Sequence, residues 1–363
     1  MPPGVWKLLE GTYTAPSWLA EDRGFEVDAL GMPSQQGTTD AYMMVMVPEA
    51  LREAPLASAP VVVFGHGILG EPADYLASMN DDAGVIELAN RLGAIVVATK
   101  WRGLTEDDQP AALEVAMDFG RFPELTDKLV QGVANTVGLM RLVKEGSLTA
   151  DPAFEGRVNG EDLRYFGISL GGIEGAVTVA NTSLVDRAVF HVGGSAWSTM
   201  LERSSNWPPF EMLVMRSVED PEDRQLLYAV SQLLWDPVDP AVWSQELAGR
   251  SVLWQEAMED NQVPNLTTEL LARSVGATLG TPSLTQPYGL TAVALPASGP
   301  ILTEFDPMLE PLSRTNRPAV NTGSHGVPRA WPGCRDQIHG FLQDGVARHF
   351  CGDGPCTATN TGE

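Results

Sequence analysis

Short apolar runs alternate with longer segments of helical spacing along most of this chain. Val61-Val62-Val63-Phe64 is a continuous, mostly β-branched run, which is typical of a strand buried on both faces. From Thr126 to Glu145 apolar residues recur at helical spacing, and the pattern stops at Gly146. Such alternation predicts an α/β protein, with a mostly parallel sheet covered by helices on both faces.

The same patterns give approximate bounds for the other elements. Further strands are predicted at 42–47, 94–99, 163–166, 187–192 and 251–255, with edge strands around 290–295 and 301–305. Further helices are predicted at 86–92, from just after 169 to about 180, and at 335–350.

A glycine-flanked serine follows one of these strands. The pentapeptide Gly167-Ile168-Ser169-Leu170-Gly171 comes after the apolar segment 163–166 and before a small-residue helical stretch. In a strand–turn–helix context, G-x-S-x-G is typical of a nucleophilic serine held on a strained turn. The glycines at 167 and 171 leave room for the adjoining strand and helix. The alternative interpretation is an ordinary glycine-rich turn.

A serine hydroxyl needs a histidine base. His325 lies in the polar loop Asn321-Thr322-Gly323-Ser324-His325-Gly326, just before the last predicted helix, and we expect it to be the base. A histidine in a flexible loop can present its ring to a serine. The other four histidines are expected to have structural or surface roles: His66, His191, His339 and His349.

The histidine in turn needs an acid to orient it. Asp260 follows the predicted strand 251–255, where a loop carboxylate can reach the far side of the imidazole. Its position between Ser169 and His325 gives the chain order Ser…Asp…His. Glu256 and Glu259 are the other candidates for the acid. The alternative interpretation is that all three carboxylates are solvated charges on a loop.

Two backbone N–H groups are candidates for binding the oxyanion. One belongs to Leu170, directly after the serine. The other belongs to Ile68, in the loop after the strand 61–64, where Gly65 and Gly67 allow the backbone to turn inward.

The interval 193–249 breaks the alternation of strands and helices. It is rich in proline and tryptophan, and its helical parts carry large apolar residues. It is either a helical insertion with its own small core or a cap that supplies an apolar pocket, and the two interpretations are compatible. We therefore expect a catalytic core of 1–192 and 250–363 with a helical cap at 193–249. Trp101 and Trp197 are candidate pocket residues, although Trp101 is equally suited to the core.

These motifs together resemble those of α/β-hydrolases of the bacterial lipase and esterase kind. The resemblance covers about 61–350 and rests on the segments 65–68, 167–171, 260–264 and 324–328. It implies a mostly parallel eight-stranded sheet, a cap inserted after the sixth strand and no cofactor. The proline-rich segment between acid and histidine, the cysteine-containing tail and the first 40 residues depart from the family pattern.

The expected activity is that of a serine carboxylic-ester hydrolase that works through an acyl-enzyme. Amide hydrolysis, polyester cleavage or acyl transfer would use the same residues, and a non-catalytic binding protein of the same fold is the alternative outside enzymes. The substrate is expected to be a small-molecule or polymeric ester, with short acyl chains favoured. The sequence contains no H-E-x-x-H motif and no paired Cys/His spacing, so no metal site is predicted.

Charge restricts the partners of the chain. The 363 residues carry a formal net charge of −24, which argues against nucleic acid or anionic membranes as partners. No apolar run approaches the ~20 residues that span a bilayer. The start, Met1-Pro2-Pro3-Gly4, lacks the features of a signal peptide. The oligomeric state is left open by the sequence.

The three cysteines lie within the last 30 residues of the chain. The predicted helix 335–350 would hold Cys334 and Cys351 too far apart to pair. Cys351 and Cys356 enclose a turn-forming Gly-Asp-Gly-Pro and are the favoured disulfide, although Cys334 could reach Cys356 if the tail folded back. A disulfide favours a secreted or periplasmic location, and the alternative is three free thiols in the cytoplasm.

Overall fold

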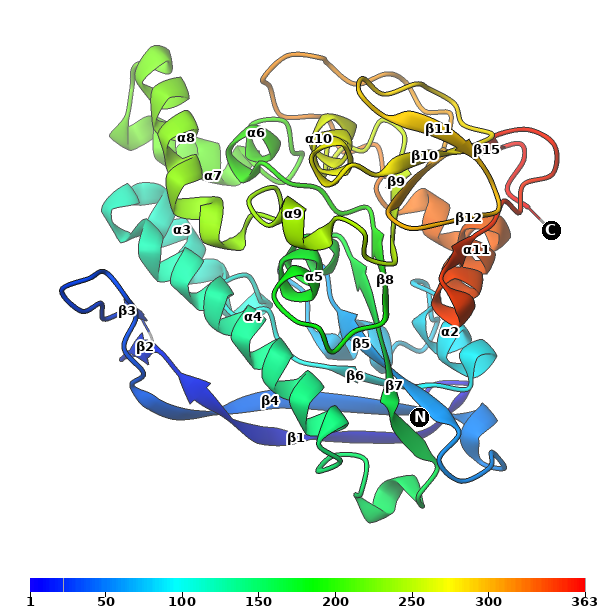
Figure 1. Ribbon diagram of the computed structural model, residues 1–363. Coiled ribbons are helices and arrows are strands. Elements are labelled where there is room, and N and C mark those ends of the chain that lie inside the picture. Colours follow the sequence, from blue (N-terminus) through cyan, green and yellow to red (C-terminus); the bar gives the residue numbers. More distant parts are fainter. Residues whose placement is uncertain (22, 363) are drawn as a thin grey trace.

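A large, mostly parallel sheet forms the centre of the molecule, as expected from the sequence (Figure 1). The structure, a computed structural model, describes residues 1–21 and 23–362. The sheet order is β1-β4-β6-β5-β7-β8-β9-β13-β10-β11, with β15 paired to β13. β4 is antiparallel to both β1 and β6, and the remaining pairs of this sheet are parallel.

The strands and helices have the following bounds. The strands are β1 Val5–Ser17, β2 Leu19–Ala20, β3 Gly24–Phe25, β4 Gly37–Pro48, β5 Ala59–Gly65, β6 Ile95–Ala98, β7 Val158–Ile168, β8 Arg187–His191, β9 Val252–Ala257, β10 Thr278–Thr281, β11 Thr291–Ala294, β12 Ala297–Ser298, β13 Ile301–Asp306, β14 Val346–Ala347 and β15 Cys356–Thr357. The α-helices are α1 Pro72–Leu76, α2 Val85–Leu92, α3 Gln109–Met117, α4 Phe122–Lys144, α5 Leu170–Ala180, α6 Trp197–Leu201, α7 Pro208–Ser217, α8 Pro221–Trp235, α9 Ser244–Leu247, α10 Asn265–Val275 and α11 Pro332–Asp344.

Two buried cores cover the two faces of the sheet. In β5, Val61 and Val63 face one core and Val62 and Phe64 the other, because successive strand residues point to opposite sides. The first core packs β5 against α4 and α5, and the second packs it against α1, α2 and α11. Burial on both faces explains why β5 reads as a continuous apolar run rather than an alternating one.

Three features of the sheet differ from the sequence prediction. The eight strands of the path from β1 to β13 are joined by β10, β11 and β15, which widen the sheet beyond the eight expected. β13 is not an edge strand, because β9 pairs with one side of it and the unpredicted β10 with the other. The first strand, β1, was also not predicted.

The C-terminal helix is shorter than predicted. α11 ends at Asp344, because Gly345 takes a left-handed conformation with φ of 76° and caps the helix. Cys351 and Cys356 form a disulfide with their Cα atoms 5.2 Å apart, as favoured from the sequence, and Cys334 is a buried free cysteine. Among the described residues, no helix has both the length and the apolar character needed to cross a bilayer.

Candidate active site

Ser169 lies on a strained turn between β7 and α5. Its φ of 57° and ψ of −117° are unusual for a residue with a side chain. Neighbouring hydrogen bonds hold the turn, since the Ser169 N–H donates to His191 O and the Ser169 carbonyl accepts from Ile173 N–H. A Cβ on Gly167 would lie 2.0 Å from the carbonyl oxygen of Gly171, so the motif requires glycine there.

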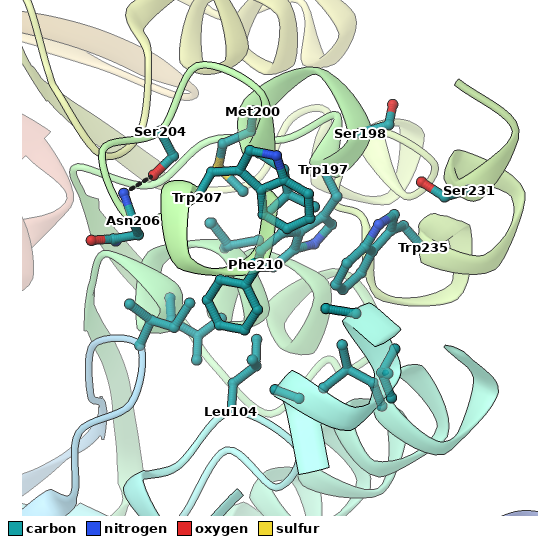
Figure 2. Close-up of a pocket in the computed structure, with 18 of the residues that line it drawn as sticks. Leu104, Trp197, Ser198, Met200, Ser204, Asn206, Trp207, Phe210, Ser231 and Trp235 are labelled. Atoms are coloured by element: carbon teal, nitrogen blue, oxygen red, sulfur yellow. Dashed lines mark hydrogen bonds between the residues drawn. The ribbon is translucent and has the colours of Figure 1, made fainter. Parts of the chain in front are cut away.

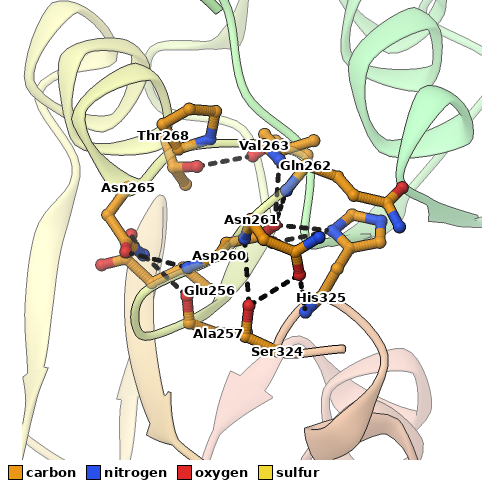
Figure 3. A network of polar contacts seen from close by, with 12 residues as sticks. Glu256, Ala257, Asp260, Asn261, Gln262, Val263, Asn265, Thr268, Ser324 and His325 are labelled. Atoms are coloured by element: carbon orange, nitrogen blue, oxygen red, sulfur yellow. Dashed lines mark hydrogen bonds and ion pairs between the residues drawn. The ribbon is translucent and has the colours of Figure 1, made fainter. Parts of the chain in front are cut away.

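Asp260 and His325 lie side by side, although 65 positions separate them in the sequence (Figure 3). His325 Nδ1 donates to the carboxylate of Asp260, with Nδ1···Oδ2 of 2.7 Å and Nδ1···Oδ1 of 3.0 Å. The Asp260 Oδ1 also accepts from the N–H groups of Gln262 and Val263. Because the hydrogen bond to the carboxylate keeps the proton on Nδ1, the neutral imidazole has its lone pair on Nε2. Within the described part of the chain, Nε2 is buried and has no hydrogen-bond partner.

The serine and the acid–histidine pair belong to the same edge of the sheet. Ser169 follows the carboxyl end of β7, and Asp260 follows that of β9, with the parallel strand β8 between them. Gln262 and Val263, whose N–H groups hold Asp260, line the same cavity as Ser169. No hydrogen bond among the described residues joins Ser169 Oγ to His325 Nε2. Such bonds are often long in unliganded enzymes and tighten when substrate binds.

The two rival carboxylates are engaged elsewhere. Glu256 Oε2 accepts from Asn265 Nδ2 at 2.9 Å, and burial raises the pKa of Glu256 well above its ordinary value. Glu259 forms an ion pair with Arg314 and accepts from Leu312 N–H, so it holds the loop that follows β13. Neither carboxylate contacts the imidazole of His325.

Asn261 connects three loops around the histidine, a role that the sequence analysis missed. It is fully buried, and its Oδ1 accepts from Ser324 Oγ at 2.8 Å and from the His325 N–H at 3.4 Å. Its Nδ2 donates to Ser205 Oγ at 2.7 Å and to Asn321 Oδ1 at 3.2 Å. Asn261 therefore ties the Asp260 loop to the His325 loop and to the segment between α6 and α7. In the sequence, only the position of Asn261 beside Asp260 could have indicated this role.

The two residues expected to bind the oxyanion both line the cavity of Ser169. The N–H groups of Ile68 and Leu170 have no hydrogen-bond partner among the described residues, and both residues line that cavity. Leu170 is the first residue of α5, whose N–H has no partner inside the helix. This arrangement is suited to binding a developing negative charge on a substrate oxygen.

His66 holds the loop that carries Ile68. Its Nε2 accepts from Trp101 N–H at 3.0 Å, so its Nδ1 is the protonated nitrogen and donates to Gly67 O at 2.8 Å. Trp101 itself is packed into the main core and is not among the described residues that line the cavity beside Ser169. Burial lowers the pKa of His66 to about 4.

His66 should make the stability of the protein depend on pH. In the unfolded chain a histidine binds a proton near its ordinary pKa of about 6.5, whereas folded His66 binds one only near about 4. Stability is therefore fully present above pH 6.5 and decreases as pH falls toward 4, by about 3 kcal/mol for this group. We expect the free energy of unfolding, measured by urea titration, to fall less steeply with pH in His66→Asn than in the wild type. Equal slopes would contradict this.

The imidazole rings of the other three histidines contact groups away from Ser169. His191 Nδ1 contacts Gln255 Oε1 at 3.0 Å, and burial lowers the pKa of His191 to about 3. His339 lies 3.4 Å from Arg91 O, and His349 lies 2.8 Å from Gly354 O. Among the described residues, no group of three or more His, Cys, Asp or Glu side chains is arranged to hold a metal ion.

A cavity of about 90 Å³ opens beside Ser169 (Figure 2). Its walls come from α3, α4 and α5 of the core and from α6, α7 and α8 of the interval 193–249. Trp197, a pocket residue expected from the sequence, lines it. Among the described lining residues, none carries a charged side chain.

Comparisons with known proteins give distant structural likenesses only. No protein-family model and no curated protein matches the sequence. Among solved structures, a thermostable esterase from Pseudomonas putida ECU1011 is similar at 16% identity, with 94% of this chain and 83% of that one covered and a TM-score of 0.49. A carboxyl esterase 2 from Tuber melanosporum is similar at 13% identity, 95% and 89% coverage and a TM-score of 0.49. An acylaminoacyl peptidase from Pyrococcus horikoshii is similar at 15% identity, 82% and 38% coverage and a TM-score of 0.40.

The sheet topology and the turn at Ser169 identify the fold. The strands of the sheet run in one direction apart from β4, and the interval 193–249 leaves the sheet after β8, the sixth strand of the sheet along the chain. A serine at φ of 57° sits on the sharp turn between a central strand and the following helix, as in the nucleophile turn of this fold. The chain is an α/β-hydrolase by fold.

Proposed function

We propose that the protein is a serine carboxylic-ester hydrolase with Ser169 as nucleophile, His325 as base and Asp260 as the residue that orients the base. The observation that carries this proposal is the environment of His325 at the sheet edge where Ser169 lies: its Nδ1 is hydrogen-bonded to a buried carboxylate, and its Nε2 has no partner in the part of the chain that the structure describes. This is the arrangement that general-base activation of a serine requires.

The proposed reaction has two stages. Ser169 Oγ attacks the ester carbonyl carbon as its proton passes to His325 Nε2, and the oxyanion accepts bonds from the N–H groups of Leu170 and Ile68. The carbonyl re-forms, the bond to the alcohol oxygen breaks, and His325 gives its proton to the leaving alcohol. Water, deprotonated by His325, then attacks the acyl carbon. The bond from that carbon to Ser169 Oγ breaks, the acid leaves, and His325 returns the proton to Oγ.

We further propose that 193–249 is a cap on a core formed by 1–192 and 250–363. The contribution of α6, α7 and α8 to the cavity beside Ser169 supports this proposal. We also propose a secreted or periplasmic location, which the Cys351–Cys356 disulfide supports because disulfides persist in oxidising compartments.

Replacing the nucleophile tests the proposal. We expect Ser169→Ala to lower kcat for 4-nitrophenyl acetate by at least ~10³-fold, since no other group in the mechanism forms the acyl-enzyme. A fluorophosphonate should label the wild type on Ser169, as read by mass spectrometry of the peptide, and should not label the variant. Ser183→Ala, at an exposed loop position, is the matched control and should keep its activity. Hydrolysis that survives in Ser169→Ala would reject the assignment.

A further inference from the structure

The lining of the cavity beside Ser169 is unusually aromatic for this chain. Seven of the 24 lining residues are Phe, Trp or Tyr, whereas aromatic residues make up 7% of the sequence. The protein has a net charge of −24, yet none of the described lining residues is charged. A charged group on a substrate would find no partner in this cavity, so the part of the substrate that enters it is neutral.

Two stacked tryptophans line the cavity. Trp197 and Trp235 are stacked, with ring centroids 4.7 Å apart and planes at 14° (Figure 2). Phe122 packs edge-on against Trp235, with centroids 4.9 Å apart and planes at 88°. All three are buried, so neighbouring rings fix their orientations.

A second aromatic group lines the same cavity. Trp207 and Phe210 are nearly parallel, with planes at 13° and centroids 5.8 Å apart. Tyr228 meets Trp207 edge-on at 5.6 Å and 81°. Rigid rings of this kind offer faces and edges to another ring at little cost in side-chain entropy.

Two hydroxyl groups on the cavity wall are bonded within the protein. Ser204 Oγ accepts from Asn206 N–H at 3.2 Å, and Ser231 Oγ donates to Tyr228 O at 2.7 Å. Among the described residues, Tyr228 Oη and the Nε1 atoms of Trp207 and Trp235 are buried without a hydrogen-bond partner. These isolated polar atoms are fewer than the partners that a sugar needs to replace its hydrogen bonds to water, so the lining disfavours a heavily hydroxylated group.

Resting on the proposed function, we propose that the substrates are esters that carry an uncharged aryl group, which enters this cavity while Ser169 attacks the carbonyl. Burial of apolar area alone would favour a saturated ring of the same size equally. An aromatic ring gains in addition from edge and face contacts with the tryptophan and phenylalanine rings, and it is stiffer than an alkyl chain.

The test compares matched pairs of esters that differ in the ring alone. On the acyl side these are ethyl phenylacetate and ethyl cyclohexylacetate, and on the alcohol side benzyl acetate and cyclohexylmethyl acetate. The methylene spacer keeps each ring out of conjugation with the ester, and hydrolysis is followed by pH-stat. We expect kcat/KM for the aryl ester, corrected for the alkaline hydrolysis rates, to exceed that of its partner about 2- to 10-fold in one arm. The arm that shows the preference identifies the side of the ester that the cavity receives.

Variants assign the preference to the cavity. Trp235→Leu and Trp207→Leu should each lower the aryl-to-cyclohexyl ratio toward one, and Trp6→Leu should leave the ratio as in the wild type, because Trp6 packs beside Lys7 and outside the cavity. A ratio of one in both arms, or a ratio unchanged in both cavity variants, overturns the aryl proposal. In either case hydrolysis that depends on Ser169 leaves the proposed function standing. If the wild-type protein hydrolyses none of these esters and no 4-nitrophenyl acetate, both proposals are rejected.

Discussion

Asp260→Asn should lower kcat for ester hydrolysis by roughly 10³- to 10⁴-fold while leaving the fold intact. In the wild type the carboxylate accepts a hydrogen bond from Nδ1–H of His325, and Nε2 has no partner among the described residues. An asparagine that turned its amide nitrogen toward Nδ1 would favour the tautomer with the proton on Nε2. That tautomer cannot remove a proton from Ser169.

The loss should fall on kcat rather than on KM, because Asp260 does not line the cavity that would bind substrate. The amide oxygen of the variant can still accept from the N–H groups of Gln262 and Val263, so the thermal midpoint should change little. Kinetics on 4-nitrophenyl acetate and a thermal melt measure both effects. Glu259→Gln, in the same loop but bonded to Arg314, is the control and should retain activity. An Asp260→Asn enzyme within tenfold of the wild type would remove Asp260 from the proposed triad.

Local patterns in the sequence predicted the elements that present the serine. β5 is apolar on both faces, and the glycines around Ser169 mark a turn with no room for side chains. Both signals lie within a few residues of the feature that they predict. The contact between Asp260 and His325 was predicted differently, from the chain order of the three residues together with the positions of their loops.

Other features could not be predicted because their causes are distant in the sequence. β1 is an edge strand that pairs only with β4 and is half-buried along much of its length, so it shows no clear alternation. The role of Asn261 depends on Ser205, Asn321 and Ser324, which two loops distant in the sequence bring to it. Trp101 follows a strand as a pocket residue would, but the packing of α4 against the sheet buries it in the core.

Gly171→Ala should destabilise the protein by about 4 kcal/mol or more, or prevent folding. A Cβ at this position would lie 2.0 Å from the carbonyl oxygen of Gly65 and 2.3 Å from its carbonyl carbon. Both obstructing atoms belong to the backbone of β5, so no side chain can move aside, and the start of α5 would have to lift from the sheet. Urea unfolding followed by tryptophan fluorescence measures the loss.

Gly11→Ala is the matched control, because a Cβ there meets nothing within 4 Å and Gly11 is not among the glycines with positive φ. Its stability should stay within ~1 kcal/mol of the wild type. The comparison also bears on the proposed chemistry. The close approach of Gly171 to Gly65 sets the spacing between the start of α5 and the end of β5, and therefore between the N–H groups of Leu170 and Ile68. A Gly171→Ala protein as stable as the wild type would mean that these two segments are not held together, and two donors without fixed spacing could not bind one oxyanion.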